Sequence, residues 1–169
     1  MIIIFNKFKR TPKLIVFICL HSVGNFAYMG KAFFEYQKER NKDLMRAFHT
    51  CMETNCGNSL EAICEKVRLT PATRFWVSEE RATIVITQIL KGEHPIMSPE
   101  KRDMYAEILS RVKAVMQTQP DRTIGDIVFE VVHQPAPRFY YTTASIREMI
   151  YRIKAEWYEQ RKQKLRHLF

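Results

Sequence analysis

One six-residue segment occurs twice in this chain, and the second copy follows the first at an offset of 64 residues. Residues 71–76 read PATRFW and residues 135–140 read PAPRFY; we call this segment the PAxRF(W/Y) motif. Apolar positions on both sides keep the same offset: Ile63 matches Ile127, Val67 matches Val131, Ile86 matches Ile150 and Ile89 matches Ile153. A fixed offset is typical of a supersecondary unit that buries its apolar face against a second copy. The sequence therefore predicts one such unit used twice.

The composition predicts a folded and mainly helical chain. A length of 169 residues suits one ordinary domain or two small ones. The hydrophobic fraction of 46% and the aromatic fraction of 12% exclude a disordered chain. The 5 glycines and 7 prolines stand mostly between periodic segments, which favours helices over a turn-rich β fold.

Apolar spacing and capping residues divide each copy into three helices. The expected helices cover about residues 31–54, 60–70 and 79–90 in the first copy, and 99–118, 124–134 and 143–166 in the second. The expected N-caps are Ser59, Ser78, Ser98, Thr123 and Thr142. The sequence thus predicts an all-α fold of two tandem three-helix repeats packed together, over residues 29–95 and 96–169. A short β-hairpin within residues 128–141 is the competing interpretation, because that stretch is rich in β-branched and aromatic residues.

Residues 1–28 differ from the rest of the chain. Four basic residues, from Lys7 to Lys13, precede the apolar run of residues 14–20, which is the outline of a secretory signal. That run is too short to span a bilayer. Three interpretations stay open: an overextended reading frame with Met29 as the start, a working signal, and an arm that packs on a membrane surface or on the core. No membrane segment is expected for residues 29–169, and the composition of this body predicts a cytoplasmic protein.

Charge and cysteines narrow the class of partner. The formal net charge is +9. Residues 1–28 contribute +4, and residues 161–166 contribute another +4. A basic protein attracts polyanions, and here the attraction is expected to come from the ends of the chain. The four cysteines form no CxxC pair and no standard zinc spacing with a histidine. Reduced thiols and no metal are therefore expected.

The helical pattern resembles the helix-turn-helix superfamily. The segments that carry the resemblance are Ser59–Val67, Pro71–Trp76 and Ser78–Leu90, with their counterparts Thr123–Val131, Pro135–Tyr140 and Thr142–Lys154. The resemblance implies double-stranded DNA as the partner and a third helix that approaches a groove. The link before the third helix is about seven or eight residues, longer than the usual three or four.

The PAxRF(W/Y) motif offers phosphate-binding chemistry. Arg74 and Arg138 stand shortly before a helix N-terminus, where backbone N–H groups and a guanidinium can bind phosphate oxygens. Trp76 and Tyr140 can stack on a base or a sugar. The expected nucleic-acid-binding residues are Arg74, Trp76, Arg81, Arg138, Tyr140, Arg147, Arg161, Lys162 and Lys164. A structural interpretation competes, in which the motif's phenylalanines fill the core and its arginines bond helix-terminal carbonyls.

Sequence motifs of catalysis are missing, since the chain contains no GxxxxGK[ST], GxGxxG, HExxH or GxSxG. No catalytic residue and no cofactor are expected. The sequence predicts a DNA-binding protein that serves as a regulator or accessory factor of a mobile element or phage. The alternative is a helical protein-interaction module, in which Trp76, Tyr140 and Tyr141 form a partner-binding patch and the motif is a structural turn. The oligomeric state stays open.

Overall fold

The computed structural model describes residues 36–54 and 59–166. The chain divides into two units, residues 1–39 and residues 40–169. Of the first unit only residues 36–39 are described, and the interpretations of residues 1–28 lie outside the described residues.

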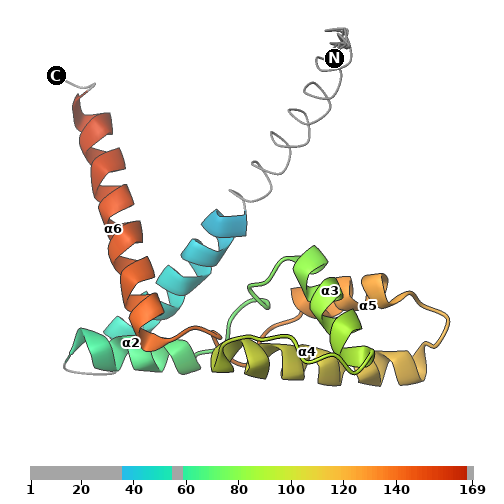
Figure 1. Ribbon diagram of the computed structural model, residues 1–169. Coiled ribbons are helices and arrows are strands. Elements are labelled where there is room, and N and C mark those ends of the chain that lie inside the picture. Colours follow the sequence, from blue (N-terminus) through green and yellow to red (C-terminus); the bar gives the residue numbers. More distant parts are fainter. Residues whose placement is uncertain (1–35, 55–58, 167–169) are drawn as a thin grey trace, which may run out of the picture. The chain divides into compact units, whose positions relative to one another are not determined.

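All regular secondary structure in the described part of the second unit is helical (Figure 1). Residues 40–53 are helical. They are followed by α2 (Leu60–Leu69), α3 (Glu79–Leu90), α4 (Pro99–Thr118), α5 (Ile124–His133) and α6 (Thr143–Arg166). The predicted all-α class is confirmed. Residues 128–133 belong to α5, so the competing β-hairpin is wrong.

Hydroxyl side chains cap five helices where the sequence predicted caps. Each oxygen accepts a hydrogen bond from the backbone N–H three residues further on, which satisfies one of the orphan donors of a helix start. These bonds join Ser59 to Ala62, Ser78 to Arg81, Ser98 to Lys101, Thr123 to Asp126 and Thr142 to Ser145. The starts of α2 to α6 are therefore set by local chemistry.

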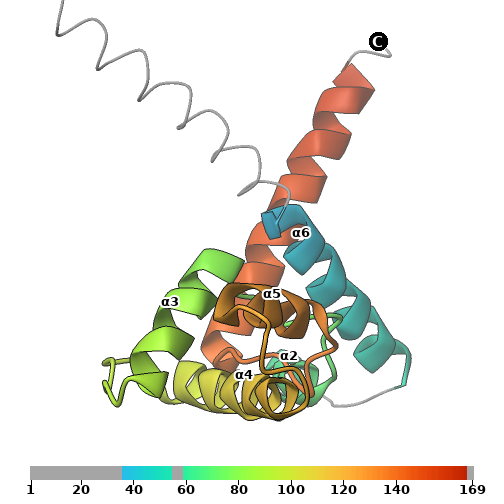
Figure 2. The ribbon, with the colours of Figure 1, turned by 90° about the vertical axis from the view of Figure 1, so that its right-hand side faces the viewer.

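Helix pairing joins some helices that are far apart in the chain. α6 packs on α2, whereas α3 packs on α5 and α4, and α4 packs on α5. Figure 2 shows α5 lying over α4 with α3 beside them. Among these five helices, α2 does not pack on α3 and α5 does not pack on α6. The second and third helices of each sequence copy therefore do not pack on each other.

The helix of residues 40–53 belongs with α2 and α6. Cys51 Sγ lies 3.9 Å from Thr70 Oγ1 at the end of α2. Lys154 of α6 places its Nζ 4.4 Å from the ring centroid of Phe48. The third helix of each sequence copy thus packs with the first two helices of the other copy.

The two connections before the third helices explain this pairing. Residues 70–78 and 134–142 lie against each other as an antiparallel bridge, in which Ala72 and Ala136 exchange two N–H···O=C bonds of 3.0 Å. The N–H of Phe75 donates to the carbonyl of Val132, and the N–H of Phe139 donates to the carbonyl of Arg68, both at 3.1 Å. A turn of three or four residues would hold consecutive helices together. These longer, extended connections instead cross and carry each third helix to the other side.

One hydrophobic core underlies both groups of helices. Its largest fully buried side chains are Phe75 and Phe139, each 1% exposed, and both come from the crossing connections. Burying an aromatic side chain of this size contributes several kcal/mol. The crossing is therefore packed as tightly as the helices around it.

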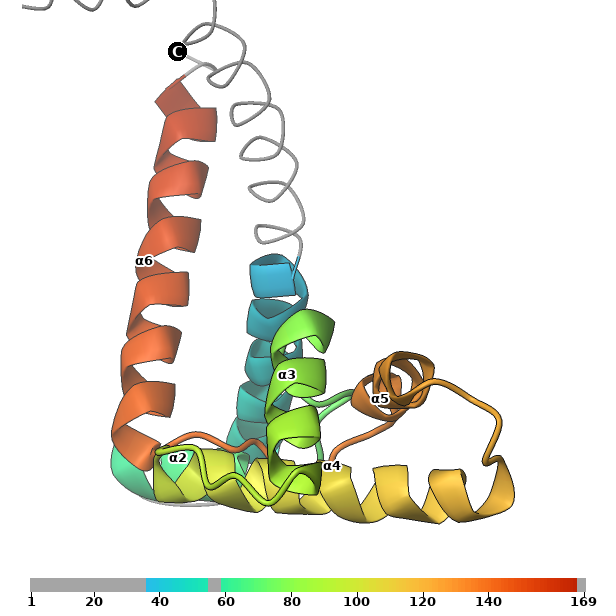
Figure 3. The same cartoon turned by 45° about the vertical axis from the view of Figure 1, so that its right-hand side comes forward.

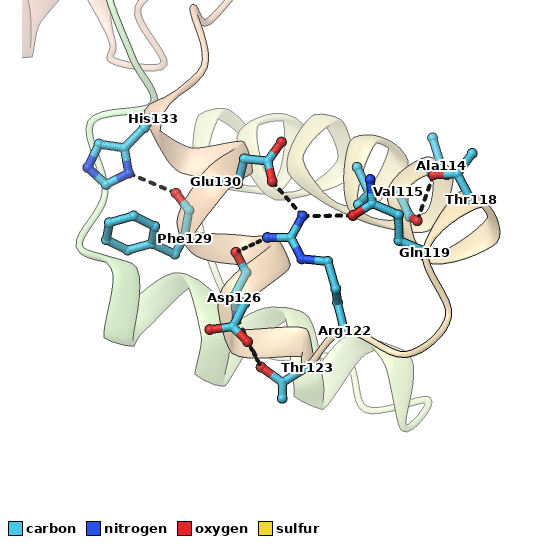
Figure 4. Close-up of polar contacts among 10 residues, drawn as sticks. All are labelled: Ala114, Val115, Thr118, Gln119, Arg122, Thr123, Asp126, Phe129, Glu130 and His133. Atoms are coloured by element: carbon cyan, nitrogen blue, oxygen red, sulfur yellow. Dashed lines mark hydrogen bonds and ion pairs between the residues drawn. The ribbon is translucent and has the colours of Figure 1, made fainter.

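Arg122 closes the turn between α4 and α5 (Figure 4). Its Nη1 donates to Gln119 Oε1 at 2.9 Å and to Glu130 Oε2 at 2.7 Å, and its Nη2 donates to the carbonyl of Asp126 at 3.5 Å. These bonds join the end of α4 to the first turns of α5.

None of the described helices combines the length and the apolar content needed to cross a bilayer.

Candidate functional site

Asp43 fixes the first copy of the PAxRF(W/Y) motif. Its Oδ2 accepts hydrogen bonds from the N–H and Oγ1 of Thr73, both at 2.9 Å, and from Trp76 Nε1 at 3.0 Å. Its Oδ1 pairs with Arg46 at 2.6 Å, and its side chain is only 3% exposed. Sequence reasoning missed Asp43; the available signal was an acidic residue directly before the apolar pair Leu44 and Met45.

Arg111 fixes the second copy. Its Nη1 donates to the carbonyl of Pro135 at 2.9 Å and to Gln134 Oε1 at 3.4 Å, and its Nε donates to Glu107 Oε1 at 2.9 Å. The guanidinium also lies 4.9 Å from the ring centroid of Phe75, within the range of a cation–π contact. α4 therefore holds both connections through one side chain, which the sequence did not single out.

Each motif arginine lies over the aromatic ring of its own motif. Arg74 is 5.8 Å from the centroid of Trp76, and Arg138 is 5.0 Å from the centroid of Tyr140. Arg138 Nη2 also contacts Asp103 Oδ2 at 2.6 Å. Arg74 Nη2 lies 3.5 Å from Glu79 Oε1, which is a longer contact. Stacking and ion pairs together hold both guanidinium groups in place.

The two motif copies line a single cleft of about 160 Å³. Arg74, Trp76, Arg138 and Tyr140 contribute to its walls, together with Lys101 from the first turn of α4. We call this the paired-motif cleft. The structure thus brings together four of the nine residues that the sequence predicted for nucleic-acid binding, although they come from positions 64 residues apart.

The other predicted residues lie elsewhere and do not line this cleft. Arg81 of α3 interacts with the hydroxyl of Tyr105, and Arg147 is exposed near the start of α6. Arg161, Lys162 and Lys164 are exposed near the end of α6. The nine predicted residues therefore lie in three places: four line the cleft, two arginines lie away from it, and three are near the end of α6.

The end of α6 is the most cationic part of the second unit. All residues from 154 to 166, which we call the α6 extension, are exposed, and they include five basic and two acidic residues. A helix rises about 1.5 Å per residue, so this stretch is about 18 Å long. In Figure 3 the C-terminal half of α6 continues well past α2. α3 ends at Leu90, the counterpart of Lys154, so the extension has no equivalent in the first copy.

Burial raises the pKa of two tyrosines at the cleft. Desolvation raises the pKa of Tyr140, and the nearby Glu107 carboxylate raises it further. Desolvation also raises the pKa of Tyr141. Both phenols are protonated at neutral pH, as ordinary tyrosines are, and can donate a hydrogen bond. Burial also raises the pKa of the Cys64 thiol, which makes it a packing residue and not a reactive one. The described residues contain no cluster of metal-ligating side chains.

Comparison with known protein families, characterised proteins and solved structures gave no match for this chain. Its function is therefore inferred from its own residues.

Proposed function

We propose that the protein binds double-stranded DNA, with the α6 extension as the main contact. Residues 40–166 carry 21 basic and 16 acidic residues, a net charge of +5. α6 alone carries seven basic and three acidic residues, so it supplies +4 of this excess. The concentration of charge on one exposed helix is the observation that carries the proposal, because phosphate neutralisation dominates non-specific DNA affinity.

The proposal also includes an interpretation of the fold of the second unit. We take the second unit as two copies of a three-helix unit that exchange their third helices. In support, α5 begins and ends 64 positions after α2, and α6 begins 64 positions after α3. The backbone bonds of the crossing connections also come in pairs with this offset. Only one of the exchanged helices is extended and basic, which favours a DNA contact by α6 and not by α3.

The paired-motif cleft supports the proposal as a second contact. Its guanidinium groups are held on aromatic rings, and its carboxylate neighbours Glu79 and Asp103 reduce the local positive charge. The cleft is therefore expected to add less affinity than the α6 extension.

Salt-dependent binding tests the proposal. A labelled random-sequence duplex is titrated with the full chain at rising salt, and fluorescence anisotropy is measured. Binding is expected to weaken with a log–log slope of several units. Replacement of Arg161, Lys162 and Lys164 by Gln should lower the slope by about 2 to 3, since each lost phosphate contact removes about 0.9.

A matched variant separates a DNA contact from net charge. Lys66, Lys91 and Lys113 are exposed on other elements, and their replacement by Gln removes the same three charges. This control should keep most of the slope. Equal losses in the two triple variants, or no binding at low salt, would refute DNA binding by the α6 extension.

A protein-interaction module is the second candidate, because α6 also exposes large apolar and aromatic side chains. Tyr151, Trp157, Tyr158 and Leu165 are all about half exposed or more, and Tyr158 reaches 68%. Exposed aromatics beside arginine are typical of interaction hot spots. In that case salt should have little effect on partner binding, and the double variant Trp157→Ala with Tyr158→Ala should abolish it.

A further inference from the structure

The paired-motif cleft has a composition that its structural role alone does not require. Phe75 and Phe139 already fill the core, and the alanine bridge already fixes the crossing. Arg74 and Arg138 nevertheless both line one cavity, and Lys101 of α4 lines it too. One carboxylate, that of Glu100, also lines it. The lining therefore contains three cations and one anion.

We propose that the paired-motif cleft binds one phosphoryl group, held by Arg74, Lys101 and Arg138. The proposal deepens the proposed function and partly rests on it, because the DNA backbone is one source of such a group. A free phosphate or a phosphate monoester is the other source.

The size of the cleft selects the ligand. A volume of about 160 Å³ corresponds to roughly five water molecules at liquid density. Inorganic phosphate has five heavy atoms, whereas sites for whole cofactors and drug-sized ligands measure about 300 Å³ or more. The cleft is therefore smaller than a site for a whole cofactor and is large enough for a phosphoryl group.

The arginines are arranged for binding before the ligand arrives. Trp76 is fixed by its bond to Asp43, and Arg74 lies over its ring; Arg138 lies over the ring of Tyr140. Side chains that are already ordered lose less conformational entropy on binding. Planar guanidinium groups also match the oxygens of a phosphoryl group in pairs.

The neighbouring carboxylates leave room for an anion. Asp103 contacts Arg138 through Nη2, and Glu79 lies 3.5 Å from Nη2 of Arg74. A guanidinium has five N–H donors, so a carboxylate and a phosphoryl group can share it. The side-chain oxygens of Ser98 and Thr142 already accept hydrogen bonds from backbone N–H groups. The starts of α4 and α6 are therefore not counted among the groups that bind the phosphoryl group.

Tryptophan fluorescence tests the proposal in the full chain. Trp76 and Trp157 are the two tryptophans, and Trp157→Phe leaves Trp76 in the cleft wall as the reporter. Inorganic phosphate titrated at constant ionic strength should change its emission with a saturable, one-site curve. Lys101→Gln and Arg138→Gln should each weaken binding about tenfold, and Lys113→Gln should leave it unchanged. Lys101 is exposed, so its variant stays informative even if Arg138→Gln unfolds.

No saturable change, or equal affinity in the Lys101 variant, would overturn the proposal. DNA titrations then identify the source of the phosphoryl group. If Lys101→Gln lowers the salt slope for DNA by about one, the cleft holds a backbone phosphate; an unchanged slope with weakened phosphate binding indicates a free phosphate ligand. The triple variant of the α6 extension should still bind phosphate, so failure of the DNA contact and failure of the cleft are separate results.

Discussion

At the scale of single residues, two polar side chains organise the crossing of the connections. Asp43 accepts three hydrogen bonds from the first motif, and Arg111 donates to the backbone of the second. Because Asp43 is buried, loss of its carboxylate would leave three donors without their acceptor.

Asp43→Ala is expected to lower the free energy of unfolding by about 3 kcal/mol, since hydrogen bonds to a charged group contribute about 1.5 to 3 kcal/mol each and partly compensate one another. Asp43→Asn should cost less, because an amide oxygen can still accept. Urea unfolding followed by circular dichroism measures both. The exposed Asp121 gives the control, and its alanine variant should stay within about 0.5 kcal/mol of the parent.

The phenylalanines of the motif give a second prediction. Phe75→Ala and Phe139→Ala should each destabilise the protein by about 3 to 5 kcal/mol, because both rings are fully buried at the crossing. Phe129→Ala should cost less than about 1 kcal/mol, because that ring is 55% exposed. A small loss at Phe75 or Phe139 in thermal or urea unfolding would show that the crossing is not part of the core.

At the scale of elements, the starts of helices were predictable and their partners were not. Ser59, Ser78 and Thr142 indicate helix starts, because their hydroxyl groups can accept hydrogen bonds from the first backbone N–H groups. Val85 and Ile86 lie three or four positions from other apolar residues of the same helix, and this spacing indicates a buried face. That spacing says that α3 is buried but not which helix covers it. The pairing depends on the crossing of two distant connections, which no local pattern records. For the same reason the shared cleft of Arg74 and Arg138 was not foreseen.

The contact between α2 and α6 is expected to depend on pH. Glu65 of α2 accepts hydrogen bonds from Arg68 and from Thr143 at the start of α6, and these hold its pKa below the ordinary value of about 4.5. Stability from the ionised carboxylate is therefore present above that value and lost as the pH falls through the lowered pKa.

Glu65→Gln is expected to destabilise the protein at neutral pH, and the difference from the parent should shrink below about pH 4. Thermal unfolding across this range measures the difference. Glu61→Gln on the same helix is the control and should show no such convergence. A constant difference between parent and Glu65→Gln at all pH values would contradict the proposed link between α2 and α6.

At the scale of the whole second unit, the pairing of helices joins both sequence copies into one packing arrangement. α3 packs on α4 and α5, and α6 packs on α2. The segment of residues 91–98 that joins the copies is largely exposed, and Gly92 adopts a left-handed φ of 85° there. The covalent link between the copies is thus separate from the contacts that hold them together.

Cleavage of that link should leave the fragments associated. A protease site placed at residues 93–97 is cut in the folded protein, and size-exclusion chromatography follows the products. Co-elution is expected, since each fragment keeps a helix that packs on the other. Separation of the fragments without denaturant would contradict the exchanged pairing; unfolding of the cut protein in a single transition would support it.

The crossed connections also have a consequence for inheritance. A half of the gene that was lost or recombined alone would encode two helices without the third that covers them, so both halves must be transmitted together. The two halves nevertheless differ at matching positions, as Trp76 and Tyr140 do, and only the second half carries the long basic end of α6. Because the basic end of α6 is exposed and lies outside the shared core, its sequence can change while the crossing stays intact.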